Sequence, residues 1–132
     1  MSRVPRSQEH LKTGFASEAA AAARYRAYAQ AAADEGRPNL AKRWRQLAEA
    51  KDELAIQQLA AAGQIRAADR LIADALAEER FENDVLYPKM IRDAGADAAA
   101  EVFREVVAAQ AGHIEELDDL RRRLQAASGD ID

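Results

Sequence analysis

Six polar residues have the types and spacing to form one chemical layer in a helical protein. They interrupt the apolar stripes of four amphipathic segments, and they are Glu18, Lys51, Glu79, Glu82, Gln110 and His113. Each lies 13 to 18 residues from one of two turns, at Gly36 and Gly95. At 1.5 Å per residue this is about 20 to 27 Å from a turn, so all six share one level to within about one helical turn.

Three carboxylates, an amine, an amide and an imidazole at one level predict either a network of ion pairs or a metal site. Burying such groups together is costly unless they pair with one another or bind a cation. A shift of the assumed stripes by one position would instead turn the side chains to solvent. The coincidence of level on all four segments favours the shared layer.

Four helices must position these residues. The 3-4 spacing of apolar residues and the glycines after it predict helices over about 7–34, 39–62, 67–93 and 97–126. Pro88 lies inside the third helix, where it removes a hydrogen bond and bends the helix unless local geometry compensates. The predicted core stripe of the second helix is Leu40, Trp44, Leu47, Lys51, Leu54 and Gln58, and that of the third includes Leu86 and Met90.

The composition predicts a single all-α domain over residues 1–132. Glycine (6), proline (3) and aromatic residues (5%) are few, and 32% of the chain carries charge of both signs. A net charge of −4 gives no basic surface for nucleic acid, and the apolar runs are too short to span a membrane. The first seven residues precede no apolar segment of the kind found in secretory signals, so we expect a cytoplasmic protein. With no cysteine, any metal must be held by carboxylates and histidines.

The two helical pairs echo each other at an offset of 59 residues. Tyr28 matches Tyr87, Trp44 matches Phe103, and the turn at Gly36 matches that at Gly95. This pattern indicates a duplicated helical hairpin, the alternative being chance similarity of two amphipathic hairpins.

Three short motifs carry a resemblance to a known family. They are Phe15-Ala-Ser-Glu-Ala, Glu79-Arg-Phe-Glu and Leu86-Tyr-Pro-Lys-Met. Together they make the chain similar to the rubrerythrins of the ferritin-like superfamily, from about Leu11 to Leu124. The resemblance implies a ferritin-like four-helix bundle made of two hairpins, which enclose a di-iron site.

The resemblance also implies roles for individual residues. Glu18, Glu79 and Glu82 fall on positions of family ligands, and Tyr25 and Tyr87 fall on tyrosines beside the metal site. The remaining family ligands come from a Glu-x-x-His motif on the second helix and another on the fourth.

This chain departs from the family at three of those four remaining positions. Lys51 and Leu54 stand on the second helix, and Gln110 stands on the fourth, where only His113 is retained. The family's bridging carboxylates are those replaced by Lys51 and Gln110, so the resemblance implies an altered site.

Three states of the site follow as alternatives. Lys51 can stand in electrostatically for a metal and produce a metal-free salt-bridge network. One divalent ion of iron, manganese or zinc can bind Glu18, Glu79, Glu82 and His113. An intact dinuclear site is the third alternative, and one ion or none is favoured over two.

The functions that follow are of different classes. The first is a binding or structural protein that has lost di-iron chemistry, and the second is a peroxide- or O₂-reducing enzyme or a metal-binding protein. We expect no rubredoxin-type domain, so a redox role requires a separate electron donor.

The short link between the second and third helices cannot cross the length of a ferritin-like bundle, which predicts a homodimer that exchanges hairpins. A plain up-down-up-down bundle is the alternative, and an iron-storage cage is a weaker possibility.

Overall fold

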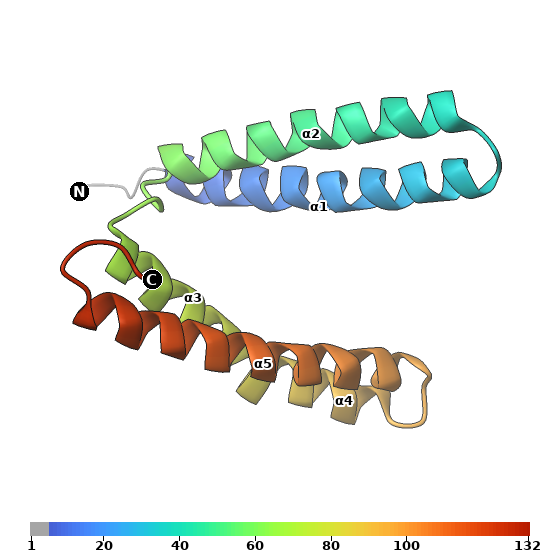
Figure 1. The fold of residues 1–132 in the computed structure, drawn as a ribbon. Helices are drawn as coiled ribbons and strands as arrows, with labels where there is room; N and C mark the ends of the chain where they lie inside the picture. Colours follow the sequence, from blue (N-terminus) through green and yellow to red (C-terminus); the bar gives the residue numbers. More distant parts are fainter. Residues whose placement is uncertain (1–5) are drawn as a thin grey trace. The chain divides into compact units, whose positions relative to one another are not determined.

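The computed structural model describes residues 6–132, and every regular element in that range is a helix (Figure 1). Residues 1–5, which belong to the segment tested above for a signal sequence, lie outside the described residues. The chain divides into two compact units, Met1–Ile65 and Arg66–Asp132, here called hairpin 1 and hairpin 2. Each hairpin is described by itself, and the prediction of one four-helix domain stays a prediction.

Hairpin 1 consists of two antiparallel helices, α1 (Ser7–Asp34) and α2 (Pro38–Ala61) (Figure 1). Gly36 ends α1 with a φ of 76°, a conformation that glycine adopts without the steric cost of a Cβ atom. The amides of Gly36 and Arg37 donate to the carbonyls of Ala33 and Ala32, which completes a Schellman motif. Pro38 then begins α2, where the amide that proline lacks has no helical partner to lose.

The helices of hairpin 1 meet along alanines. Its buried apolar residues in the described range are Ala21, Ala22, Ala29, Ala32, Ala41, Ala48, Ala55 and Ala62. We call these eight residues the alanine seam, and its α2 side repeats every seventh residue, the spacing of a coiled coil. Small side chains bring the two backbones close together.

The core stripe predicted for α2 packs against α1 only in part, through Trp44 and Lys51, while its leucines lie outside the alanine seam. Leu40, Leu47 and Leu54 remain 47%, 50% and 45% exposed. The prediction identified the polar and aromatic residues of this contact but missed the alanines beside them, which are the buried residues of the interface. Gln58, also predicted on the stripe, folds over Gly14, where a Cβ atom would lie 1.7 Å from its Oε1.

Hairpin 2 pairs a helix that contains an irregular turn with a regular helix. Its first arm comprises α3 (Ala68–Phe81), a five-residue π-helical segment η1 (Glu82–Leu86) and α4 (Tyr87–Ala94), and its second arm is α5 (Ala99–Ala126). The Tyr87 amide donates to the Glu82 carbonyl, five residues back. The interruption expected at Pro88 therefore takes the form of a π turn directly before it.

The π turn also changes which residues face α5. Leu86, predicted on the core stripe, is 39% exposed, while its neighbour Tyr87 is half-buried. The prediction for Leu86 was wrong because a regular period of 3.6 residues does not include the extra residue of a π turn.

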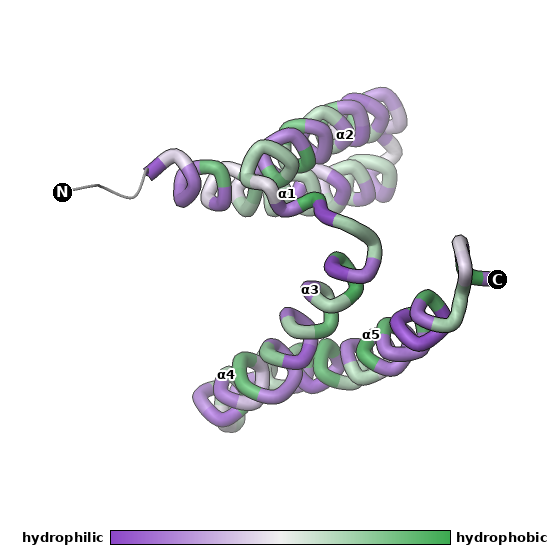
Figure 2. Tube along the Cα trace, turned by 90° about the vertical axis from the view of Figure 1, so that its left-hand side faces the viewer, coloured by the Kyte–Doolittle hydropathy of each residue, from purple (hydrophilic) through white to green (hydrophobic). Residues whose placement is uncertain are grey.

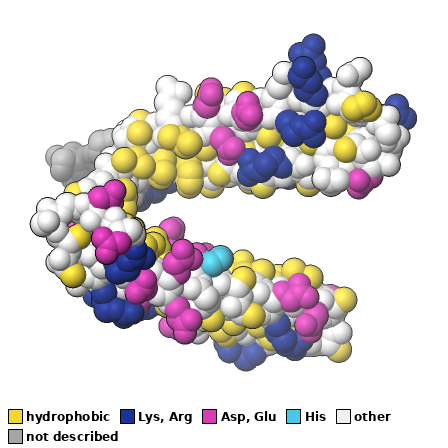
Figure 3. All heavy atoms as spheres, in the orientation of Figure 1, with side chains coloured by type: hydrophobic (Ala, Val, Ile, Leu, Met, Phe, Trp, Pro, Cys, Tyr) yellow, Lys and Arg dark blue, Asp and Glu magenta, His cyan; other side chains and the backbone are white. Residues whose placement is uncertain are grey.

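Both hairpins are amphipathic, and Figure 2 shows hydrophobic and hydrophilic stretches alternating along their helices. Hydrophobic side chains also reach the surface on the face that Figure 3 displays. The exposed large ones include Leu40, Leu47, Leu54 and Ile56 in hairpin 1, and Phe81, Val85 and Val102 in hairpin 2. A single pair of helices cannot enclose large side chains on all sides, so these residues stay partly uncovered within each hairpin.

Within residues 6–132, no helix has both the length and the apolar character needed to cross a membrane.

Candidate functional site

Hairpin 1 brings Glu18 of α1 and Lys51 of α2 together. Lys51 Nζ lies 2.8 Å from Glu18 Oε2, and the two side chains are 30% and 23% exposed. Glu18 lies before the turn at Gly36 and Lys51 after it, so antiparallel pairing of the helices places them at one level. One of the three predicted carboxylates is thus already neutralised by a side chain of its own hairpin.

Lys51 is held in its charged form. Its direct contact with the Glu18 carboxylate raises the pKa of Lys51 above the ordinary 10.5, against the opposing effect of partial burial. The negative charge of Glu18 and the nearby Tyr25 add to this rise. The ammonium is therefore a permanent positive charge at neutral pH and a poor nucleophile.

Tyr25, whose charge influences Lys51, belongs to a cluster of three aromatic rings in hairpin 1. The ring centres of Tyr25 and Trp44 are 5.1 Å apart, those of Tyr28 and Trp44 are 5.1 Å apart, and those of the two tyrosines are 6.0 Å apart. These distances are typical of favourable aromatic packing. Tyr25 is thus a packed neighbour of the site in hairpin 1.

Hairpin 2 brings together the four remaining polar residues of the predicted layer. Gln110 Nε2 donates a long hydrogen bond of 3.4 Å to Glu82 Oε1, and His113 Nδ1 lies 3.5 Å from Glu79 Oε1. Gln110 is the one buried polar side chain in the described part of the chain, at 7% exposure. Each of the two glutamates therefore faces a residue of α5.

Two side-chain oxygens in hairpin 2 could accept further hydrogen bonds. Glu79 Oε2 and Gln110 Oε1 are buried and have no hydrogen-bond partner among residues 6–132. Buried acceptors without partners are rare in folded proteins and need an explanation such as a bound water or cation. The atoms available to bind a metal are carboxylate and amide oxygens and one imidazole nitrogen. This set of ligand atoms suits a single divalent ion.

The side chains do not form a metal cluster as they stand. No three His, Asp or Glu side chains in the described range are close enough together to hold an ion. The side chain of His113 is 55% exposed, so much of its surface is not packed against other residues. Binding of an ion by Glu79, Glu82 and His113 therefore requires these side chains to turn toward one another.

The remaining predicted residues lie at the edges of these clusters. Leu54 is partly exposed on α2, and offers no metal-binding atom. Tyr87 packs on Phe103 of α5, with ring centres 6.1 Å apart. This pair and the Tyr28–Trp44 pair are the aromatic positions matched at an offset of 59 residues, and both are in contact.

Sequence reasoning missed Asn83. Its Nδ2 donates to the carbonyl of Val107 in α5 at 2.9 Å, from within the π segment. An asparagine beside Glu82 and five residues before a proline gave a weak signal, because neither residue type by itself predicts a π turn.

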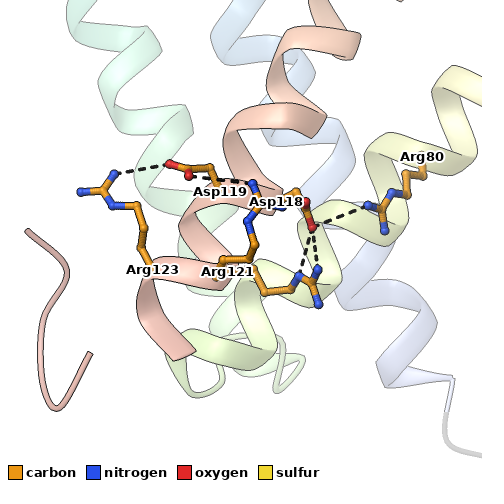
Figure 4. A network of polar contacts seen from close by, with 6 residues as sticks. Arg80, Asp118, Asp119, Arg121 and Arg123 are labelled. Atoms are coloured by element: carbon orange, nitrogen blue, oxygen red, sulfur yellow. Dashed lines mark hydrogen bonds and ion pairs between the residues drawn. The ribbon is translucent and has the colours of Figure 1, made fainter. Parts of the chain in front are cut away.

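The arginines near the end of α5 take part in a separate network (Figure 4). Asp118 accepts from Arg121 at 2.6 Å and pairs with Arg122, and Arg80 of α3 approaches it to 3.9 Å. The bond from Arg121 and the charges of the two neighbouring arginines lower the pKa of Asp118. These arginines are thus engaged in ion pairs within hairpin 2.

Comparison of the chain with models of known protein families and with curated proteins gave no match.

Proposed function

We propose that this chain is a rubrerythrin-like protein that has lost dinuclear iron chemistry and acts as a binding or structural protein. Two contacts support this proposal. Lys51 pairs with Glu18 at 2.8 Å, and Gln110 donates to Glu82 at 3.4 Å. Lys51 and Gln110 stand at the family's bridging positions. Each therefore contacts a glutamate that falls on a ligand position of the family.

Charge supports the same conclusion. The three glutamates contribute −3 and Lys51 contributes +1, which leaves −2, while Gln110 is neutral. A pair of divalent ions brings +4 and requires many anionic ligands to balance it. The altered layer matches one divalent ion in charge, and Lys51 takes the place of the other.

The unpartnered oxygens in hairpin 2 favour a second candidate function, namely the binding of one divalent metal ion. Glu79, Glu82, Gln110 and His113 would hold it, and Glu18 would join them only if it released Lys51. Such an ion would supply Lewis acidity or one-electron chemistry, and a separate electron donor would be needed for reduction of peroxide or O₂. The residues themselves would set the coordination and the surrounding charge.

We further propose a ferritin-like bundle in which two copies exchange hairpins. Each hairpin leaves large apolar side chains exposed, and a second hairpin packed on that face would cover them. Residues 62–67 connect α2 to α3 and reach about 20 Å at most, whereas the 24 residues of α2 span about 36 Å. A single chain therefore cannot place its own α2 and α3 parallel within one bundle. If two copies exchange hairpins, the parallel α2 and α3 of each bundle come from different chains, so no long connection is needed.

The experiment is metal analysis of the whole chain after expression in medium supplemented with iron and manganese. We expect the wild type to hold at most one ion per chain. A variant combining Lys51→Glu, Leu54→His and Gln110→Glu changes the charge of the layer from −2 to −5 and is expected to hold two. Sedimentation of the same samples gives the number of copies in the assembly.

A matched control carries the same two charge changes on exposed polar positions, namely Lys42→Glu and Gln57→Glu, and is expected to bind no more metal than the wild type. Two ions per wild-type chain would contradict the proposal. A single ion that catalyses peroxide consumption faster than the free metal would favour the enzyme over the binding protein.

A further inference from the structure

The π segment sits where the first arm of hairpin 2 changes from polar to aromatic contacts with α5. On its N-terminal side, Glu79 and Glu82 meet His113 and Gln110. On its C-terminal side, Tyr87 packs on Phe103. Both sets of contacts exist at once, so both stretches of the arm must face α5.

In a regular α-helix these two stretches of the arm could not both face α5. Each residue of an α-helix turns about 100°, so Tyr87, eight positions after Glu79, would point about 80° away from it. A π turn takes up one extra residue and removes about 100°, which leaves the two side chains within roughly 20° of each other. The π turn therefore allows Glu79, Glu82 and Tyr87 to face α5 at the same time.

Two residues stabilise that turn. Pro88 has no amide to donate to the Asp84 carbonyl and its ring would crowd that carbonyl in a regular helix, which disfavours the α-helical alternative. Asn83 fixes the turn to its partner helix through the 2.9 Å bond from Nδ2 to the Val107 carbonyl. This bond lies one residue from Glu82 and one turn of α5 from Gln110.

We propose that Asn83 is a positioning residue, which locks the π turn against α5 and thereby aims Glu82 at Gln110 and Glu79 at His113. The proposal rests on the proposed function for its consequence, because these glutamates are the groups that the layer uses. The side chain of Asn83 bonds to the backbone of Val107 and to none of the six polar residues. It would nevertheless determine how those residues meet.

The test compares the full-length wild type with Asn83→Ala by NMR of the Gln110 side-chain amide. We expect the substitution to shift the Gln110 Nε2 resonances and speed their exchange with water, because Glu82 turns away. Asn83→Asp keeps the volume but loses the donor, so it should behave like Asn83→Ala and serves if the alanine variant fails to fold. Val85→Ala, an exposed change within the same π segment, should leave the Gln110 signals unchanged.

A second readout is the titration of each protein with Co²⁺, followed by the visible absorption of the ion. Loss of a residue that orients ligands weakens metal affinity by about 10- to 100-fold, and we expect this for Asn83→Ala against wild type. If the wild type binds no Co²⁺, the single-metal candidate fails, while the NMR comparison still decides the role of Asn83. Unchanged Gln110 signals in both Asn83 variants, or equal changes in Val85→Ala, would overturn the proposal.

Discussion

Gln110→Glu tests the core of the site in hairpin 2. The substitution replaces a neutral amide by a carboxylate at a position that is 7% exposed and 3.4 Å from Glu82 Oε1. Two unit charges at that separation repel by about 5 kcal/mol at an effective dielectric of 20. The variant can instead hold a proton, which costs about 3.7 kcal/mol at pH 7 for a carboxyl with an ordinary pKa of about 4.3. Protonation is the smaller cost, so we expect a loss of about 2 to 4 kcal/mol in the free energy of unfolding at pH 7.

The pH dependence has a definite sign. Repulsion raises the pKa of the carboxyl pair in the folded state, so the penalty is absent below about pH 4 and grows as the pH rises above the unfolded pKa. A divalent ion should remove most of the penalty, since it neutralises both carboxylates. Urea unfolding at pH 4 and pH 7, with and without Mn²⁺, measures both effects.

The control for this prediction is Gln57→Glu, the same change at an exposed position of α2. It should alter stability by less than about 0.5 kcal/mol. Equal stability of the two variants at pH 7 would refute the reasoning, since Gln110 would then not face Glu82 in a buried setting.

Two further predictions concern the elements that hold the site. Ala48→Leu places a large side chain in the alanine seam and should reduce the free energy of unfolding by about 1 to 3 kcal/mol, whereas Ala50→Leu on the exposed face should be nearly neutral; urea unfolding decides between them. Asp118 has a lowered pKa, so its ion pairs contribute stability above its ordinary pKa of 3.8 and lose it as the pH falls through the lower folded value. In the Asp118→Asn variant the free energy of unfolding should therefore fall less steeply as the pH is lowered. An unchanged dependence of this free energy on pH would show that the ion pairs contribute nothing.

The sequence predicted the helices well because their ends carry strong local signals. The predicted ends and those in the structure differ by no more than two residues, as expected where glycines and prolines mark the turns. Counting residues outward from Gly36 and Gly95 predicted that Glu18 and Lys51 share one level, as do Glu82 and Gln110, and the structure pairs them. Antiparallel helices joined by short turns preserve such counts.

The faces of the helices were harder to predict. Leucine periodicity indicated one face of α2, yet the alanines on the adjacent face pack against α1 because small side chains permit closer approach. The π turn was invisible to a pattern that assumes 3.6 residues per turn, so Leu86 was assigned in place of Tyr87, and Asn83 was overlooked. These errors share a cause, namely that packing between helices decides which of two neighbouring stripes is buried.

The π turn also bears on how the two hairpins are related. The positions that echo each other, from Tyr28 and Tyr87 onward, all lie on the C-terminal side of η1. If one hairpin arose as a copy of the other, a single-residue insertion before Tyr87 would displace every earlier position by one and erase the match there. In that case one copy would carry the π turn and a carboxylate pair facing its partner helix, while the other would keep a regular helix and a single ion pair.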